Sequence, residues 1–188
     1  MFLDIGVGIL MAFGVGTYYA VPVDRMLIIA GVIFALLPDT DYLIHLMRGN
    51  SSRNAHRHRD LLHYPLLLIP AGILVLYPFG AAWSALFGFC ALAHFIHDSI
   101  GIGWGVQWLW PLGDQHYSFF YLYKPKHRPQ KLPRKLLYVW NHAEIDDLNA
   151  RYGDEEWIRN IYLRWHPYAI VEFVVFLVAI MVLFWHIK

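Results

Sequence analysis

The residues best suited to chemistry in this chain are a histidine and an aspartate, His94 and Asp98, in an otherwise apolar stretch. They lie four positions apart, and at that spacing two side chains project from the same face of a helix. An ionisable side chain in a segment of membrane-like composition is costly unless it is paired or bound to a metal. The pair therefore predicts a functional polar site, in which His94 and Asp98 could be metal ligands.

A second candidate motif is a pair of aspartates that follows Pro38. Asp39 and Asp41 flank Thr40, and because Pro38 disfavours helix at the residue before it, we expect a turn here. In a turn the two carboxylates can bind one cation or bridge two. The alternative is that Asp39 or Thr40 caps a helix that begins at Tyr42.

A third motif contains His58 and His63, which lie five positions apart. At this spacing they do not share a face of a regular helix. They converge only if one lies on a loop and the other on the first turn of the next helix. The alternative is a solvated, lipid-facing patch formed with the neighbouring arginines.

Imidazole and carboxylate donors without thiolate favour zinc, manganese or iron, and make magnesium less suitable. The set is large enough for one ion with spare groups, or for two. Two neighbouring metals are a common device for splitting phosphoesters, because they stabilise both the attacking and the departing oxygen. The candidate ligands from these motifs are Asp39, Asp41, His58, His63, His94 and Asp98.

The composition indicates a membrane protein. The chain has 188 residues, of which 58% are hydrophobic, 17% aromatic and only 15% charged, with a mean hydropathy of +0.40. The net charge of +1 provides no basic field for nucleic acid, so nucleic-acid binding is not expected. Cys90 is the one cysteine of the chain and cannot form an intrachain disulfide.

The elements that must position these motifs are apolar runs. Residues 1–23 are long enough to cross a bilayer, and 26–38 are short for a full crossing. Residues 64–94 predict a helical hairpin that turns at Pro78 and Gly80, with one kinked helix as the alternative. Residues 168–187 are the clearest span. The expected fold is all-α: a polytopic membrane bundle of about five apolar helices, some short or kinked.

We expect three parts along the chain: a membrane-embedded metal-site domain at 1–120, a strap with interfacial helices at 121–167, and a transmembrane helix at 168–188. Residues 124–135 hold six basic side chains, three prolines and no acid, which predicts a strap near anionic headgroups. Asp154 is a candidate N-cap for an amphipathic helix that follows it, which we expect on the membrane surface.

The distribution of positive charge predicts the orientation. If the N-terminus is cytoplasmic and five runs alternate, loops 45–63 and 99–167 both lie inside, and they hold every Lys and Arg except Arg25 and Lys188. The same topology places Asp4 and the other polar motifs at the cytoplasmic ends of their helices. We therefore predict a multi-pass integral membrane protein whose polar site lies on the cytoplasmic side of the membrane.

Three stretches, LLPDTDYL, HRDLLHYPLL and HFIHDSIGIGWGVQWLWPL, together resemble the YdjM-like family of inner-membrane metal-dependent hydrolases. The likeness covers about residues 1–120 and implies that the aspartates and histidines of the three motifs are the metal ligands. Asp4, four residues before Gly8, takes the place of a family histidine, and Tyr64 stands where the family tends to have serine. Asp4 could still bind a metal, or it could mark a changed metal or a lost activity.

The predicted function is a membrane-bound metal-dependent hydrolase with one or two divalent ions, zinc being favoured. Metal-activated water would act on a phosphoester or ester of an amphipathic or lipid-like substrate at headgroup depth. Arg59 would hold an anionic group, and Asp60 would handle the proton. One alternative is a non-catalytic membrane protein whose His/Asp cluster binds a structural metal or conducts an ion. Another is an adaptor whose basic strap binds anionic membrane lipid.

Overall fold

The computed structural model describes residues 1–47, 62–126 and 132–187, and these residues are mostly helical. They divide into two compact units. The helical unit comprises Met1–Asp39, Leu67–His94 and Pro167–Lys188, and the mixed unit comprises Thr40–Leu66 and Phe95–His166. His94 lies in the helical unit with Asp4 and Asp39, and His63 lies in the mixed unit with Asp41 and Asp98.

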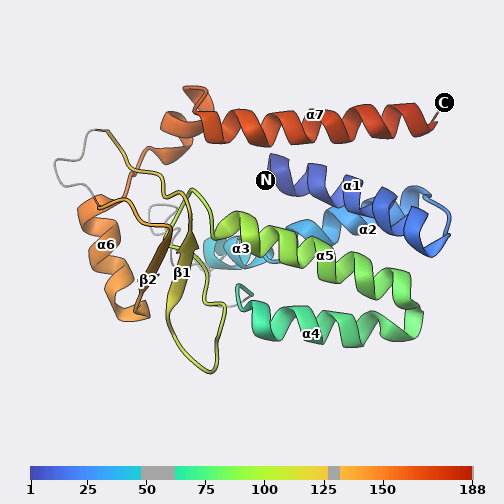
Figure 1. The fold of residues 1–188 in the computed structure, drawn as a ribbon, viewed down its shortest axis with the longest axis horizontal. Helices are drawn as coiled ribbons and strands as arrows, with labels where there is room; N and C mark the ends of the chain where they lie inside the picture. The colour runs from blue at the N-terminus through green and yellow to red at the C-terminus, as the bar shows by residue number, and fades with distance from the viewer. Residues whose placement is uncertain (48–61, 127–131, 188) are drawn as a thin grey trace. The chain divides into compact units, whose positions relative to one another are not determined.

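Apolar helices make up the helical unit, and their course can be followed in Figure 1. They are α1 (Phe2–Tyr19), α2 (Arg25–Leu36), α4 (Pro65–Leu76), α5 (Ala81–Asp98) and α7 (Pro167–Ile187). The first two residues of α4 and the last four of α5 belong to the mixed unit.

Small residues allow α1 and α2 to approach closely. Gly8 on α1 lies against Gly31 on α2, where an added Cβ at either glycine would meet the backbone of the other helix. The side chain of Asp24 begins α2 by accepting a hydrogen bond from the amide of Leu27 at 2.9 Å. The buried core of this unit comes from α1, α2 and α5, with Ala12, Val15, Leu27, Ala35, Ala82, Leu86 and Cys90.

The predicted hairpin at Pro78 and Gly80 is confirmed. Helix α4 leads into a 3₁₀ turn, Tyr77–Phe79, and Gly80 follows with φ of 116°, a conformation that favours glycine. Helix α5 then packs against α4, where the Ser84 hydroxyl donates to the Ile73 carbonyl at 3.2 Å. The chain therefore reverses at this turn rather than continuing as one kinked helix.

Two of the described helices, Phe2–Tyr19 and Pro167–His186, are long and apolar enough to cross a membrane. The apolar helices Arg25–Leu36 and Pro65–Phe79 are shorter. Five apolar helices were predicted and are present. Only two of the described helices are long enough to be complete spans, so a bundle of five complete spans is not confirmed. Helix α7 has an exposed apolar surface formed by Val171, Val174, Leu177 and Met181.

The mixed unit corrects the expectation of an all-α chain. It contains a two-stranded antiparallel sheet of β1 (His116–Phe119) and β2 (Leu137–Trp140), in which His116 faces Trp140 and Phe119 faces Leu137. Aromatic and β-branched residues dominate both strands, and such residues favour a pleated, half-buried surface. Each strand has only four residues, and over so short a stretch strand and helix signals cannot be told apart, so the sequence did not reveal this pair of strands.

Short helices complete the mixed unit. They are α3 (Thr40–Met47), the 3₁₀ turn His142–Glu144, α6 (Ile145–Tyr152) and a π-helical turn at Arg159–Leu163. Asp154 acts as a cap, because its Oδ1 accepts from the Glu156 amide at 3.0 Å. The helix predicted after it is only this short, irregular turn.

Candidate metal centre

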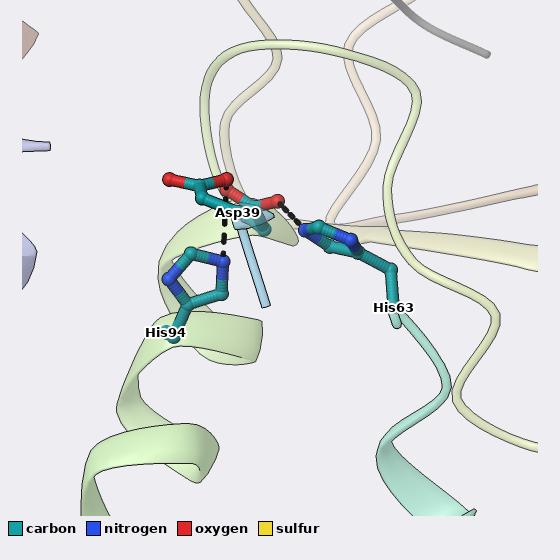
Figure 2. Close-up of side chains that lie close together, drawn as sticks. Asp39, His63 and His94 are labelled. Carbon is teal, nitrogen blue, oxygen red and sulfur yellow. Dashed lines mark ion pairs between the residues drawn. The ribbon is translucent and has the colours of Figure 1, made fainter. Parts of the chain in front are cut away.

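His94 lies near the C-terminal end of α5 between two carboxylates of the helical unit. Its Nδ1 is 3.2 Å from Asp4 Oδ1, and its Nε2 is 3.7 Å from Asp39 Oδ1 (Figure 2). His94 and Asp4 are buried, whereas the Asp39 side chain is 37% exposed. One imidazole thus faces an acid on each side.

The order of helices explains why these three residues meet. Asp4 lies in the first turn of α1, Asp39 follows the end of α2, and His94 lies near the end of α5. Because α1 and α2 are successive and packed together, the start of one lies near the end of the other. Three residues from distant sequence positions therefore reach one end of the helical unit.

His63 has the same arrangement within the mixed unit. Its Nδ1 is 2.8 Å from Asp41 Oδ2, and its Nε2 is 3.1 Å from Asp98 Oδ2. Asp41 Oδ2 also accepts from the Leu62 amide at 3.3 Å. His63 and Asp41 are almost completely buried, and the Asp98 side chain is 13% exposed.

The two histidines share one pattern of partners. Each places Nδ1 against a buried aspartate, Asp41 for His63 and Asp4 for His94, and each turns Nε2 toward a second carboxylate. Metal-binding histidines commonly donate one ring N–H to a carboxylate, which fixes the tautomer and leaves the other nitrogen for the metal. The geometry suits Nε2 as the metal-binding atom of both rings.

The surroundings of His63 favour a positive charge. Burial alone would lower its pKa, but the hydrogen bonds and negative charges of Asp41 and Asp98 outweigh burial and raise the pKa to about 9. Without a metal, His63 is therefore an imidazolium at neutral pH. A cation bound at Nε2 would take the place of that proton.

Three links join these residues, and each link lies within one unit or one helix. Asp39 faces His94, His94 and Asp98 share a face of α5 one turn apart, and Asp98 faces His63. Asp39, His63, His94 and Asp98 form a group that could hold a metal ion. Two imidazoles and two carboxylates are a donor set suited to zinc, manganese or iron.

The residues predicted for the site fall into three classes. Asp39, His63, His94 and Asp98 belong to the group of potential ligands. Asp4 and Asp41 contact the Nδ1 atoms of the histidines. His58, Arg59 and Asp60 lie outside the described residues.

One acidic residue near the site was not predicted from the sequence. Glu172 on α7 is buried, and its Oε2 is 3.9 Å from the amino group of Met1, which in turn is 2.8 Å from Asp4 Oδ2. The signal that could have identified it is a single carboxylate in a long apolar run, since such residues usually face a polar interior.

A pair of histidines in the mixed unit was also not predicted from the sequence. His116 on β1 is buried, and its Nε2 lies 3.0 Å from His142 Nδ1, with the two rings stacked. Burial alternates along β1 and turns His116 and Ser118 inward. The alternation of residue types would instead place the aromatic Tyr117 and Phe119 inside, so the sequence held no signal for this pair.

A cavity in the helical unit lies away from His94 and its carboxylates. It has a volume of about 360 Å³ and is lined by residues that include Tyr19, Asp24 and Trp83. Trp83 is eleven residues before His94 on α5, which corresponds to about 16 Å along a helix. This cavity therefore contributes nothing to the candidate metal centre.

Comparison with known proteins gives one match. The family model described as YdjM inner membrane protein matches residues 4–187. No curated protein and no solved structure matches the chain.

Proposed function

The chain belongs to the YdjM inner membrane protein family, and we propose that it is a membrane-bound metal-dependent hydrolase. The observation that carries the proposal is the pair of buried histidines, each with Nδ1 on one aspartate and Nε2 toward another. Gathering four carboxylates around two buried imidazoles, with two of the carboxylates buried as well, would be costly without a cation. A divalent metal would neutralise part of this negative charge.

We assign Asp39, His63, His94 and Asp98 as the metal ligands. Asp4 and Asp41 would accept the Nδ1 protons of His94 and His63, which holds each ring in the tautomer that presents Nε2. Zinc is the favoured ion, with manganese or iron as alternatives. A metal bound here would lower the pKa of a water ligand toward neutrality and polarise an ester or phosphoester oxygen.

Two residues would act on the substrate itself. Arg59 would hold an anionic group, bidentately if that group is a phosphate, and Asp60 would accept and return a proton. Both follow His58 directly in the chain, and His58 would be a further ligand if a second ion binds. These assignments come from the sequence and its likeness to the family.

An amphipathic or lipid-like substrate fits a site at the membrane boundary. Asp4 and Glu172 each lie in the first turns of a helix long enough to span, and each is buried. We propose a multi-pass topology in which α2 and the α4–α5 hairpin also lie in the bilayer. Exposed Ile29, Ile33, Leu74 and Val75 on α2 and α4 support this placement.

A structural metal is the second candidate function, and the number of donors favours it. Four protein ligands are enough to close a tetrahedral shell, whereas catalytic zinc keeps one position for water. The partial exposure of Asp39, against the burial of both histidines, favours an open position on the Asp39 side.

Metal analysis of the purified protein tests the proposal. Wild type, Asp39→Ala and His94→Ala would be compared by inductively coupled plasma mass spectrometry, with Asp147→Ala on α6 as the control because Asp147 is 58% exposed. We expect a bound divalent metal in wild type and control, and its loss in both site variants. The same metal content in all four proteins would contradict the proposal that this is a metal-dependent hydrolase.

Catalysis needs its own measurement. Metal-loaded wild type would be assayed against phosphodiester and ester substrates, including phospholipids, beside His94→Ala. Hydrolysis by wild type alone supports the enzyme. Full metal occupancy with no turnover, together with X-ray absorption showing four protein donors and no water, would favour the structural metal instead.

A further inference from the structure

The residues that lead into α7 expose large apolar side chains. Leu163 is 73% exposed and Trp165 is 68% exposed, and Pro167, the first residue of α7, follows two positions after Trp165. A chain advances at most about 3.6 Å per residue, so both side chains start within about 15 Å of the first turn of this candidate span. Aromatic residues at such positions commonly lie at the membrane interface.

A second segment of the mixed unit meets the first. The hydroxyl of Tyr121 lies 3.3 Å from Nε2 of His166, the residue before Pro167. Phe120, which precedes Tyr121, is 69% exposed, and its amide donates to the Leu136 carbonyl at 2.6 Å. Leu136 is 77% exposed. Three chain segments thus present exposed apolar side chains close to the start of α7.

Positive charge surrounds these apolar residues. Arg164 lies between Leu163 and Trp165, and Arg134 and Lys135 directly precede Leu136. Burial, with a contribution from the charge of Lys126, lowers the pKa of His166, so this lysine also lies nearby. All four cationic side chains are exposed.

Two acids near these cations are held by hydrogen bonds and an ion pair. Asp154 Oδ2 accepts hydrogen bonds from Tyr123 and from Asn160, each at 2.8 Å, and Asp154 Oδ1 accepts from the Glu156 amide. Glu156 pairs with Arg159 at 3.5 Å. These acids therefore stabilise the segment before α7, while the four cations beside Leu136 and Trp165 have exposed side chains.

We propose that Phe120, Leu136, Leu163 and Trp165 form an interfacial anchor that inserts into the headgroup layer of an anionic bilayer. Lys126, Arg134, Lys135 and Arg164 contact the lipid phosphates around it. Lipid is the occupant because the anchor continues directly into a helix of spanning length in an inner membrane family, and because its basic rim complements anionic headgroups. The anchor does not depend on the metal centre.

Depth measurements on the full chain in liposomes test the apolar part. Spin labels would be attached at Leu136→Cys and Leu163→Cys, with Ala150→Cys on exposed α6 as the matched control; Cys90 is fully buried and would not react. We expect the first two labels to collide mainly with oxygen, and the control label mainly with an aqueous nickel chelate. If all three labels are equally aqueous, the face binds a protein or nothing, and the proposal is overturned.

Lipid retention tests the basic part. Native mass spectrometry would count phosphatidylglycerol and phosphatidylcholine bound to wild type, to Lys126→Glu with Arg164→Glu, and to Arg151→Glu on α6. We expect phosphatidylglycerol binding to fall about fivefold for each charge removed, with Arg151→Glu unchanged. Equal retention of the two lipids by wild type, or equal binding by the two charge variants, would overturn the role of the cations.

Discussion

At the scale of single residues, the four aspartates of the site differ in which histidine nitrogen they face. Asp4 and Asp41 contact the Nδ1 atoms of His94 and His63, while Asp39 and Asp98 face the Nε2 atoms. An aspartate that orients a histidine tunes metal affinity, whereas an aspartate that is a ligand is needed for the metal to bind. Substitutions at the two kinds of position should therefore differ in severity.

The first prediction compares Asp41→Asn with Asp98→Asn. Asparagine at 41 keeps an oxygen for the His63 Nδ1 proton but loses the charge, so we expect metal affinity to fall about 10- to 100-fold. Asp98→Asn removes a charged ligand and should weaken binding further. Competition with a chelator of known affinity measures both, and equal losses would show that Asp41 is itself a ligand.

The second prediction concerns pH. The pKa of His63 is raised to about 9, so a proton competes with the metal at every pH below that value. Metal affinity should rise as pH increases from 6.5 toward 9. In the metal-free protein the charged interaction of His63 has the opposite effect: it stabilises the fold fully below about pH 6.5, and the stabilisation is lost as pH rises through 9.

Chelator competition at pH 6.5, 7.5 and 8.5, beside thermal unfolding of the metal-free protein, measures the two trends. The control is His116→Gln, which removes a different buried histidine of the mixed unit and should leave both trends unchanged. An affinity that is flat across this range would mean that His63 carries no proton to displace.

At the scale of elements, α5 and the contact between α1 and α2 decide the geometry. Helix α5 presents His94 and Asp98 one turn apart, and each of these residues faces a carboxylate or imidazole of its own unit. The Gly8–Gly31 contact fixes how closely α1 approaches α2. Asp4 lies one turn before Gly8 on α1, so its position near His94 depends on this packing.

The third prediction is that Gly8→Ala destabilises the protein while Gly14→Ala does not. A Cβ at Gly8 would lie 2.5 Å from the Gly31 carbonyl oxygen and would force two backbones apart, whereas a Cβ at Gly14 meets nothing within 4 Å. We expect a loss of about 1–3 kcal/mol for Gly8→Ala and a change of zero to about 1 kcal/mol in favour of folding for Gly14→Ala. Thermal unfolding in detergent, with metal content measured in parallel, compares them.

At the scale of the whole molecule, the membrane topology follows from the number of helices that cross the bilayer. Two described helices have the required length, whereas the distribution of Lys and Arg fits five crossings with a cytoplasmic N-terminus. The short helices need neighbours in the helical unit, because a 12-residue helix such as α2 extends only about 18 Å.

The fourth prediction is therefore topological. A reporter inserted within residues 124–135 should be cytoplasmic, and one fused after Lys188 should lie on the opposite side. Paired alkaline phosphatase and fluorescent protein fusions report the two locations. Finding the 124–135 insertion outside would reverse the proposed orientation and move the metal centre to the other face.

The sequence by itself determined the family, the mostly helical class, the α4–α5 hairpin and the types of donor that the chain offers, because local signals carry them: apolar runs, proline and glycine at turns, and short motifs. Only the tertiary structure decided which carboxylate meets which imidazole nitrogen, that Glu172 lies near Asp4, and that His116 is buried in a small sheet. These features join residues far apart in the chain, and helix packing and burial, rather than spacing, set their distances.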